Sequence, residues 1–205
     1  MLDTYDNLID AVTRWSHRKD TLDIIPDFIA LAEYEMFNNE EVQLAVREME
    51  TINALVTSEQ LIDLPCNYEK MRSIKIISSG DTLDLLYRTP DQLQRRSNGM
   101  PRFYTIIGNK IEFDCVPDNY YDVSISFYKK PCALTSDNQT NIILTNYPNI
   151  YLFGVLHQLY FWSRDTDESV EYALKFQGAI KGANKADKKA RYGVASSVPL
   201  PRGVV

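Results

Sequence analysis

A run of apolar side chains in the last third of the chain constrains the fold more than any other feature. A helix through this run has almost no polar face, so other elements must pack around it on several sides. His157 and Gln158 interrupt the run, which is too short and too polar there to span a bilayer. The apolar positions are Tyr151, Leu152, Phe153, Val155, Leu156, Leu159, Tyr160, Phe161 and Trp162.

A second predicted helix follows the apolar one and ends in a basic run. Thr145 or Asn146 is expected to cap the apolar helix, with Pro148 in its first turn, and Asp165 or Asp167 to cap the second. The inner side of the second helix is predicted to carry Val170, Tyr172, Ala173, Leu174, Phe176, Ala179 and Ile180. Its basic end carries Lys181, Lys185, Lys188, Lys189 and Arg191.

The first 50 residues predict two more helices. Apolar residues recur at helical spacing from Tyr5 to Trp15, with Asp3 or Thr4 as the cap. The polar break at residues 16–20 ends this helix, and a second one begins near Ile25-Pro26. Residues 40–57 mix both periods and are interpreted as a helical turn that runs into a strand.

From residue 61 to 134 the hydrophobic period changes to two, which is typical of strands. Residues 103–107 and 111–115 are predicted to pair across a tight turn at Gly108-Asn109. Glu112 and Asp114 are expected on the polar face of this sheet, and a short helix is expected to begin at Thr89-Pro90.

These patterns predict an α+β fold. The N-terminal helices (residues 1–48) and the C-terminal helices (residues 142–192) are expected to form one helical scaffold domain. An antiparallel β module (residues 49–134) is inserted between them, and residues 193–205 are expected to form a flexible C-terminal arm.

Charge is divided unevenly along the chain, whose net charge is −6. Residues 1–50 hold twelve acidic and four basic side chains, whereas residues 171–205 hold seven basic and two acidic ones. The negative balance disfavours general binding to nucleic acid, and the division suggests contact between copies or docking on an acidic partner. Two separately solvated faces would explain the same division.

The sequence contains no clear catalytic or metal-binding pattern. Its two histidines, His17 and His157, lie in a polar loop and in the apolar helix, and the glycines match no phosphate-binding motif. We expect no cofactor, no metal and no enzymatic activity. A pair of carboxylates for glycoside cleavage is the open alternative, because such pairs are defined by separation in space. The three dispersed cysteines and the acidic start predict a reduced, cytosolic protein without a signal peptide.

Several short segments, taken in order, resemble the head-to-tail adaptor proteins of short-tailed bacteriophages. The resemblance covers residues 5–193. The matching segments are Ile25-Pro26-Asp27-Phe28-Ile29, Leu64-Pro65, Met71-Arg72-Ser73-Ile74, Leu86-Tyr87-Arg88-Thr89-Pro90-Asp91-Gln92-Leu93, Gly99-Met100-Pro101-Arg102-Phe103-Tyr104, Tyr151-Leu152-Phe153-Gly154 and Ala186-Asp187-Lys188-Lys189-Ala190-Arg191-Tyr192-Gly193.

This resemblance implies a structural role in the virion. Such adaptors form a ring, usually of twelve copies, that joins the portal to the tail and closes the DNA-filled capsid. The partners implied are the portal protein, a tail nozzle or fibre protein and other copies of the chain. DNA would pass through the lumen without specific binding, no membrane would be involved, and the chain would reside in the host cytoplasm before assembly.

We predict that the basic C-terminal region contacts the portal or a neighbouring subunit; the simpler reading is a solvated helix end. The residues assigned to this contact are Lys185, Lys188, Lys189, Arg191, Tyr192 and Arg202. Two other functions stay open at this point: a tail-tube or nozzle protein of the same virion, and a cell-wall-degrading glycosidase.

Overall fold

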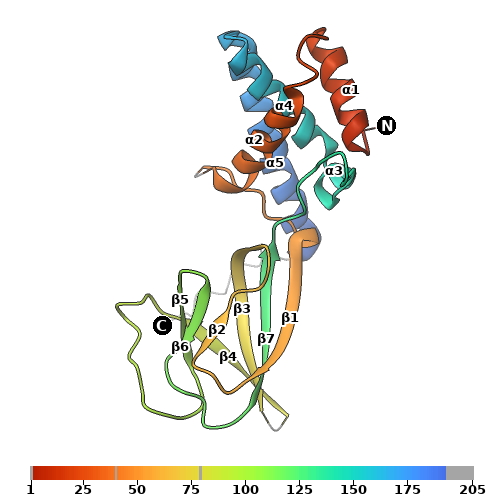
Figure 1. Ribbon diagram of the computed structural model, residues 1–205. Coiled ribbons are helices and arrows are strands. Elements are labelled where there is room, and N and C mark those ends of the chain that lie inside the picture. Colours follow the sequence, from red (N-terminus) through yellow and green to blue (C-terminus); the bar gives the residue numbers. More distant parts are fainter. Residues whose placement is uncertain (1, 40, 79, 193–205) are drawn as a thin grey trace, which may run out of the picture. The chain divides into compact units, whose positions relative to one another are not determined.

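The computed structural model describes residues 2–39, 41–78 and 80–192, and shows a mixed α+β chain (Figure 1). The chain divides into two compact units. One contains residues 1–48 and 131–205 and is called the helical unit; the other contains residues 49–130 and is called the β unit. The predicted arm at 193–205 lies outside the described residues.

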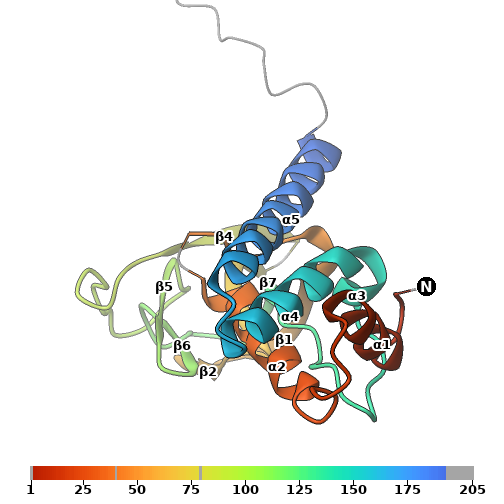
Figure 2. The ribbon, with the colours of Figure 1, turned by 90° about the horizontal axis from the view of Figure 1, so that it is seen from above.

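In its described residues, the helical unit has five α-helices, of which α4 is central. These are α1 (Tyr5–Ser16), α2 (Ile25–Asn38), α3 (Ile142–Asn146), α4 (Pro148–Trp162) and α5 (Thr166–Tyr192). Helix α4 contacts each of the other four, and Figure 2 shows it alongside the longer α5. This arrangement explains why the sequence of α4 lacks a polar face: a central helix must bury several sides.

The ends of the first helices follow from their sequence. Thr4 caps α1, because its Oγ1 accepts a hydrogen bond from the Asn7 N–H at 3.2 Å. His17 ends α1 in the left-handed conformation, with φ of 55°. Pro26 lies in the first turn of α2. The predictions for both helices are therefore confirmed.

The predicted start of α4 was partly wrong. Pro148 begins the helix as expected, but Thr145 and Asn146 belong to the short helix α3. Asn141 caps α3 by accepting hydrogen bonds from the N–H groups of Ile143 and Leu144, at 3.1 and 2.9 Å. The sequence contained two adjacent cap signals, and the pattern alone did not separate them.

The β unit is a seven-stranded sheet. Its strands are β1 (Glu50–Thr57), β2 (Leu61–Asp63), β3 (Tyr68–Ser78), β4 (Asp81–Tyr87), β5 (Phe103–Ile107), β6 (Lys110–Phe113) and β7 (Tyr121–Lys129). Their order is β1-β7-β3-β4-β5-β6-β2, and every pair is antiparallel except β4 with β5. The sheet is thus mostly antiparallel, with one parallel pair that the period of two did not reveal.

The sheet curls around a single apolar core. Buried residues of β2 through β7 form one cluster. The strands β1 and β2 occupy opposite edges of the sheet but are joined by residues 58–60 alone, so the edges approach each other at that corner. The β5–β6 hairpin turns at Gly108, whose φ of 59° suits glycine, as the sequence predicted.

The segment between β4 and β5 corrects two predictions. Residues 88–102 form a turn and extended chain instead of a helix, and Glu112 and Asp114 are buried instead of solvent-facing. Arg96 donates from Nε and Nη2 to Asp114 Oδ2, at 3.0 and 2.7 Å, and Arg95 forms a similar pair with Glu112. These charged pairs hold the loop against the sheet. Their formation explains why the segment adopts this course instead of the predicted short helix.

Residues 40–57 begin differently from the prediction. Their later part is a 3-10 turn, Arg47–Met49, that runs into β1 as expected. Residues 41–46, in contrast, are extended instead of helical, and Val42, Leu44 and Val46 are buried by alternation.

Helices α2, α4 and α5 meet at Gly154. A Cβ atom at this position would lie 2.9 Å from Phe176 of α5 and 3.1 Å from the Cβ of Ala32 in α2. Contacts below 3.0 Å are severely repulsive, so glycine allows two helices to approach α4 at one level. The identity of residue 154 therefore limits how closely this core can pack.

We predict that Gly154→Ala destabilises the helical unit by roughly 1–2 kcal/mol, because overpacking outweighs the gain in helix propensity. Urea unfolding followed by tryptophan fluorescence measures this, since Trp15 and Trp162 are the chain's two tryptophans and both belong to that unit. Gly178→Ala in α5 is the matched control, because no atom lies within 4 Å of its added Cβ. It should stabilise the unit by about 0.5–1 kcal/mol. Equal effects of the two variants would contradict the packing argument.

Glu33 holds the segment that leads into α3. Its Oε1 accepts hydrogen bonds from Tyr151 Oη at 2.7 Å and from the Leu134 N–H at 3.0 Å. Burial raises the pKa of Glu33 above its ordinary value of 4.5, although both hydrogen bonds act in the opposite direction. The folded state therefore binds the proton more tightly than the unfolded state does.

This shift has a definite sign for stability. The contribution is fully present below pH 4.5 and is lost as the pH rises through the raised pKa of folded Glu33. Glu33→Gln keeps an acceptor oxygen without the charge, so the free energy of unfolding of wild type relative to this variant should fall between acidic and neutral pH. Urea titrations from pH 4 to pH 7 test this. A difference that does not depend on pH would contradict it.

Candidate functional site

The basic end of α5 is the surface that the sequence singled out. Lys185, Lys188 and Lys189 are exposed, as is Lys181 one turn earlier. None of these four forms an ion pair with another described residue, whereas Lys175 is bound to Glu171 one turn away at 2.5 Å. Four unneutralised ammonium groups over less than three turns give this end of α5 a concentrated positive charge.

Three other predicted contact residues lie differently. Arg191 is largely buried, and its Nε donates to Asp187 Oδ2 at 2.6 Å. Tyr192 ends α5, but its side chain is outside the described part of the structure, and Arg202 is outside the described residues altogether. The structure thus brings the three lysines together on one helix end and places Arg191 in a contact within the helical unit.

Asn184 and Asp187 hold the extended segment 43–47 against α5. Asn184 Oδ1 accepts a hydrogen bond from the Ala45 N–H at 3.0 Å, and its Nδ2 donates to the Gln43 carbonyl at 2.8 Å. Asp187, which is 6% exposed, accepts from the Arg47 N–H at 3.2 Å and binds the Arg191 guanidinium. We call this set the α5 clamp.

The clamp was not identified from the sequence, although a signal exists. Phe176, Ile180 and Ala183 form the buried stripe of α5, and Asn184 and Asp187 continue it at helical spacing. Polar residues on a buried stripe are rare unless they are hydrogen-bonded, so their position indicates a structural partner. Because Asn184 and Asp187 lie between Lys181 and Lys189 on α5, the clamp also fixes the helix end that carries the exposed lysines.

The acidic residues of the N-terminal helices fall into two groups. Asp3, Asp6, Asp10, Asp20, Asp23, Asp27 and Glu41 are exposed. Glu33 and Glu35 are partly buried and hydrogen-bonded within the helical unit, Glu35 to Gln158 at 3.0 Å. The exposed group makes the surface of α1 and its following loop predominantly negative.

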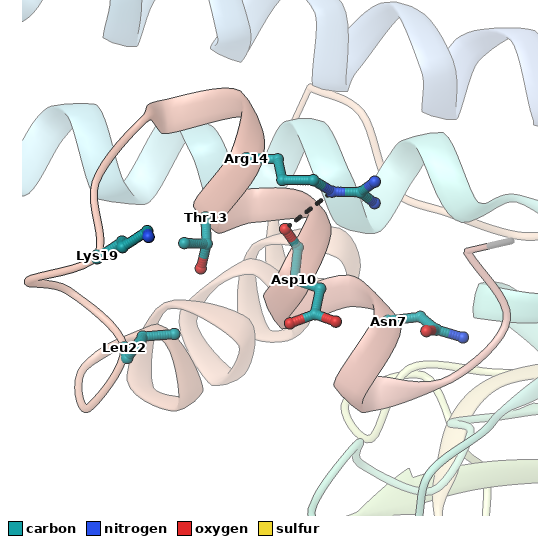
Figure 3. Close-up of a pocket in the computed structure, with 6 residues that line it drawn as sticks. All are labelled: Asn7, Asp10, Thr13, Arg14, Lys19 and Leu22. Atoms are coloured by element: carbon teal, nitrogen blue, oxygen red, sulfur yellow. Dashed lines mark hydrogen bonds between the residues drawn. The ribbon is translucent and has the colours of Figure 1, made fainter.

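A depression of about 530 Å³ lies on this surface. Figure 3 shows side chains from α1 and from the loop that follows it around the depression, with Arg14 Nε donating to the Asp10 carbonyl at 3.3 Å. Its lining residues are Asn7, Asp10, Thr13, Arg14, Lys19 and Leu22. Acidic and basic groups are interleaved there, which favours a polar protein contact over a small-molecule site with convergent groups.

Exposed apolar side chains gather on other parts of the helical unit. Phe161 is 70% exposed and Trp162 is 50% exposed at the end of α4, and the Arg18 guanidinium lies 5.4 Å from the Trp162 ring centroid. Val170 and Leu174 of α5 are also exposed, so their predicted place on the inner side was wrong. Aromatic residues and arginine are enriched in protein interfaces, and this composition fits an assembly surface.

The histidine of the apolar helix is satisfied by local contacts. His157 Nδ1 lies 2.9 Å from the Ser169 carbonyl oxygen and 3.1 Å from Ser169 Oγ.

Within the described residues, no group of histidine, cysteine or carboxylate side chains could hold a metal ion. Among the described helices, none combines the length with the apolar composition that a membrane-spanning helix requires.

We predict that Asn184→Ala frees segment 43–47, because it leaves the Ala45 N–H and the Gln43 carbonyl without their partner. The loss should be about 1–3 kcal/mol, with faster amide hydrogen exchange at Ala45. Lys185→Ala is the matched control, since it truncates the neighbouring exposed side chain. Unchanged exchange at Ala45 in Asn184→Ala would show that the clamp does not hold the segment.

Comparison with known protein families identifies a match over almost the whole chain. The model of the SU10 adaptor protein family matches residues 3–199, which is nearly the whole chain. No curated protein matches the sequence.

Proposed function

The chain belongs to the SU10 adaptor protein family, a family of phage head-tail adaptors, and on this basis we propose that it forms a ring joining the portal to the tail. A phage structural adaptor is a component of the virion, and the family is not an enzyme class. In the proposed assembly, usually of twelve copies, the ring closes the DNA-filled capsid and offers a platform to a tail nozzle or fibre protein.

The observation that carries this proposal is the match along residues 3–199, and the charge distribution supports its geometry. A cyclic ring requires two different surfaces on each copy that fit each other. The exposed aspartates of α1 and the exposed lysines of α5 are complementary in sign. The negative surface of one copy would therefore meet the basic helix end of its neighbour or of the portal.

Charge would orient the two surfaces but contribute little to the free energy of binding. An exposed ion pair contributes only about 0–1 kcal/mol, and salt at cellular concentration screens it. The exposed apolar side chains, with Phe161 and Trp162 foremost, would supply most of the free energy once the copies are aligned. We further propose that the free chain forms no ring in the host cytoplasm until the portal aligns the copies.

The buried carboxylates favour this structural role over glycoside cleavage. Glu112 and Asp114 are bound by arginines, Asp187 belongs to the α5 clamp, and Glu33 holds the Leu134 segment. Each therefore has a structural partner in the fold. A glycosidase needs a carboxyl pair facing a substrate groove at about 5–10 Å separation.

Native mass spectrometry of the purified chain, alone and mixed with the portal ring of the same virus, tests the adaptor role. A chain that forms no ring alone and adds to the portal in about a dozen copies is expected. A chain that forms a ring alone, or that binds only a completed connector, would instead identify a tail-tube or nozzle protein.

We predict that the double variant Lys188→Glu and Lys189→Glu weakens addition to the portal by roughly tenfold or more at low salt. The matched control is Lys70→Glu and Lys129→Glu, which reverses two exposed lysines of the β unit and changes the net charge equally. Portal binding that both variants weaken equally would assign the effect to net charge. Binding that neither variant changes would remove these lysines from the interface.

A further inference from the structure

Strand β1 presents a long, uncapped edge. It spans eight residues, Glu50–Thr57, and among the described residues it pairs on one side only, with β7. Its sequence contains no proline, and between the terminal residues it carries no charge. Folded proteins usually protect such edges with lysine, proline, a bulge or a covering segment, because the free backbone groups can accept another strand.

The exposed face of this edge strand is apolar. Ile52 is 69% exposed, Val56 is 62% exposed, and Ala54 between them is also exposed. On the neighbouring strand β7 the register places Ser126, Ser124 and Asp122 beside these three residues. The apolar stripe of β1 therefore does not continue onto β7, and on the outermost strand it adds side-chain contact to any backbone pairing along the edge.

This stripe is symmetric about Ala54. If two copies of β1 pair antiparallel with Ala54 opposite itself, Ile52 faces Val56 of the other copy, and the reverse pair repeats the contact. On the other face Asn53 lies opposite Leu55. Glu50, which binds Arg72 at 3.0 Å, falls opposite the uncharged Ser58, so no like charges oppose each other.

We propose that the β1 edge binds a second copy of the chain by two-fold antiparallel pairing centred on Ala54. In that register apolar residues face apolar residues and no like charges oppose each other, which supports a second copy as the partner. A two-fold contact cannot repeat around a ring, so this pair is a form of the free protein that opens before a ring closes. The pair concerns the chain before it joins the ring, and the proposed addition of the chain to the portal stays the same.

Analytical ultracentrifugation of the purified chain tests the pairing. Ile52→Lys removes both Ile–Val contacts of the two-fold pair and should raise the dimer Kd by roughly tenfold or more. Ile77→Lys is the matched control, because Ile77 shares the same face of the sheet but lies on the internal strand β3. Circular dichroism of each variant verifies that it folds.

Cross-linking tests the register itself. In a background with Cys66 and Cys132, the two exposed cysteines, changed to serine, Ala54→Cys should form a disulfide-linked dimer with oxidised glutathione. Asn53→Cys should not, because residue 53 lies diagonal to its copy at about 7–8 Å. Cross-linking of both variants would indicate unspecific collision and overturn the proposed register.

The remaining outcomes are also decisive. A wild-type chain that stays monomeric at high concentration, and an Ala54→Cys variant that stays reduced, would overturn the two-fold proposal. If Ile52→Lys then abolished binding of a tail protein to the assembled ring, the edge would be assigned to that heterologous strand. Because portal addition is measured separately, failure of the β1 pair does not affect the adaptor role.

Discussion

The close approach of α2 and α5 to α4 at Gly154 is the constraint on which the helical unit depends. A central helix can be apolar on nearly all sides only if several helices share its length, and a side chain at residue 154 would separate two of them. A Cβ at residue 154 would lie 3.1 Å from the Cβ of Ala32 and 2.9 Å from the ring of Phe176, so both side chains contact α4 only because residue 154 has no side chain. The neighbouring core residues Ile29, Val155 and Ile180 are then buried completely or nearly so.

Buried polar and charged side chains fix the irregular segments, which have few apolar contacts of their own. Arg96 and Asp114 fasten the loop before β5, and Asn184 and Asp187 fasten the segment before β1. In both places a buried carboxylate accepts from the backbone as well as from a guanidinium: Asp187 accepts the N–H of Arg47, and Asp114 accepts the N–H groups of Arg102 and Phe103. A buried charge is tolerated when it is satisfied in this way.

These two kinds of interaction explain which features could be predicted from the sequence. The helices α1 and α2, the β5–β6 hairpin and the mixed α+β class depend on local periodicity, caps and glycine, which the sequence displays directly. The buried position of Asp114 depends instead on Arg96, eighteen residues earlier, and no local pattern contains that information. Thr89-Pro90 resembles a helix start but leads into a loop, because those distant ion pairs hold the chain extended.

The candidate surfaces divide in the same manner. The exposure of the α5 lysines could be predicted, because a run of lysines that follows an apolar stripe is solvated unless acidic partners are buried with it. Arg191 belongs to the same run but reaches Asp187 on its own helix. Val170 and Leu174 were predicted to be buried, because apolar residues at helical spacing usually belong to the core, but both are exposed.

That error bears on the proposed assembly. Because exposed ion pairs contribute little, a ring guided only by the divided charge would dissociate in salt. Apolar residues that sequence reasoning places inside and the structure places outside are the side chains that a subunit contact can bury. In this chain the same helix α5 carries both, with Leu174 66% exposed and the lysines further along. One helix can thus provide the charge that orients a neighbouring copy and the apolar surface that retains it.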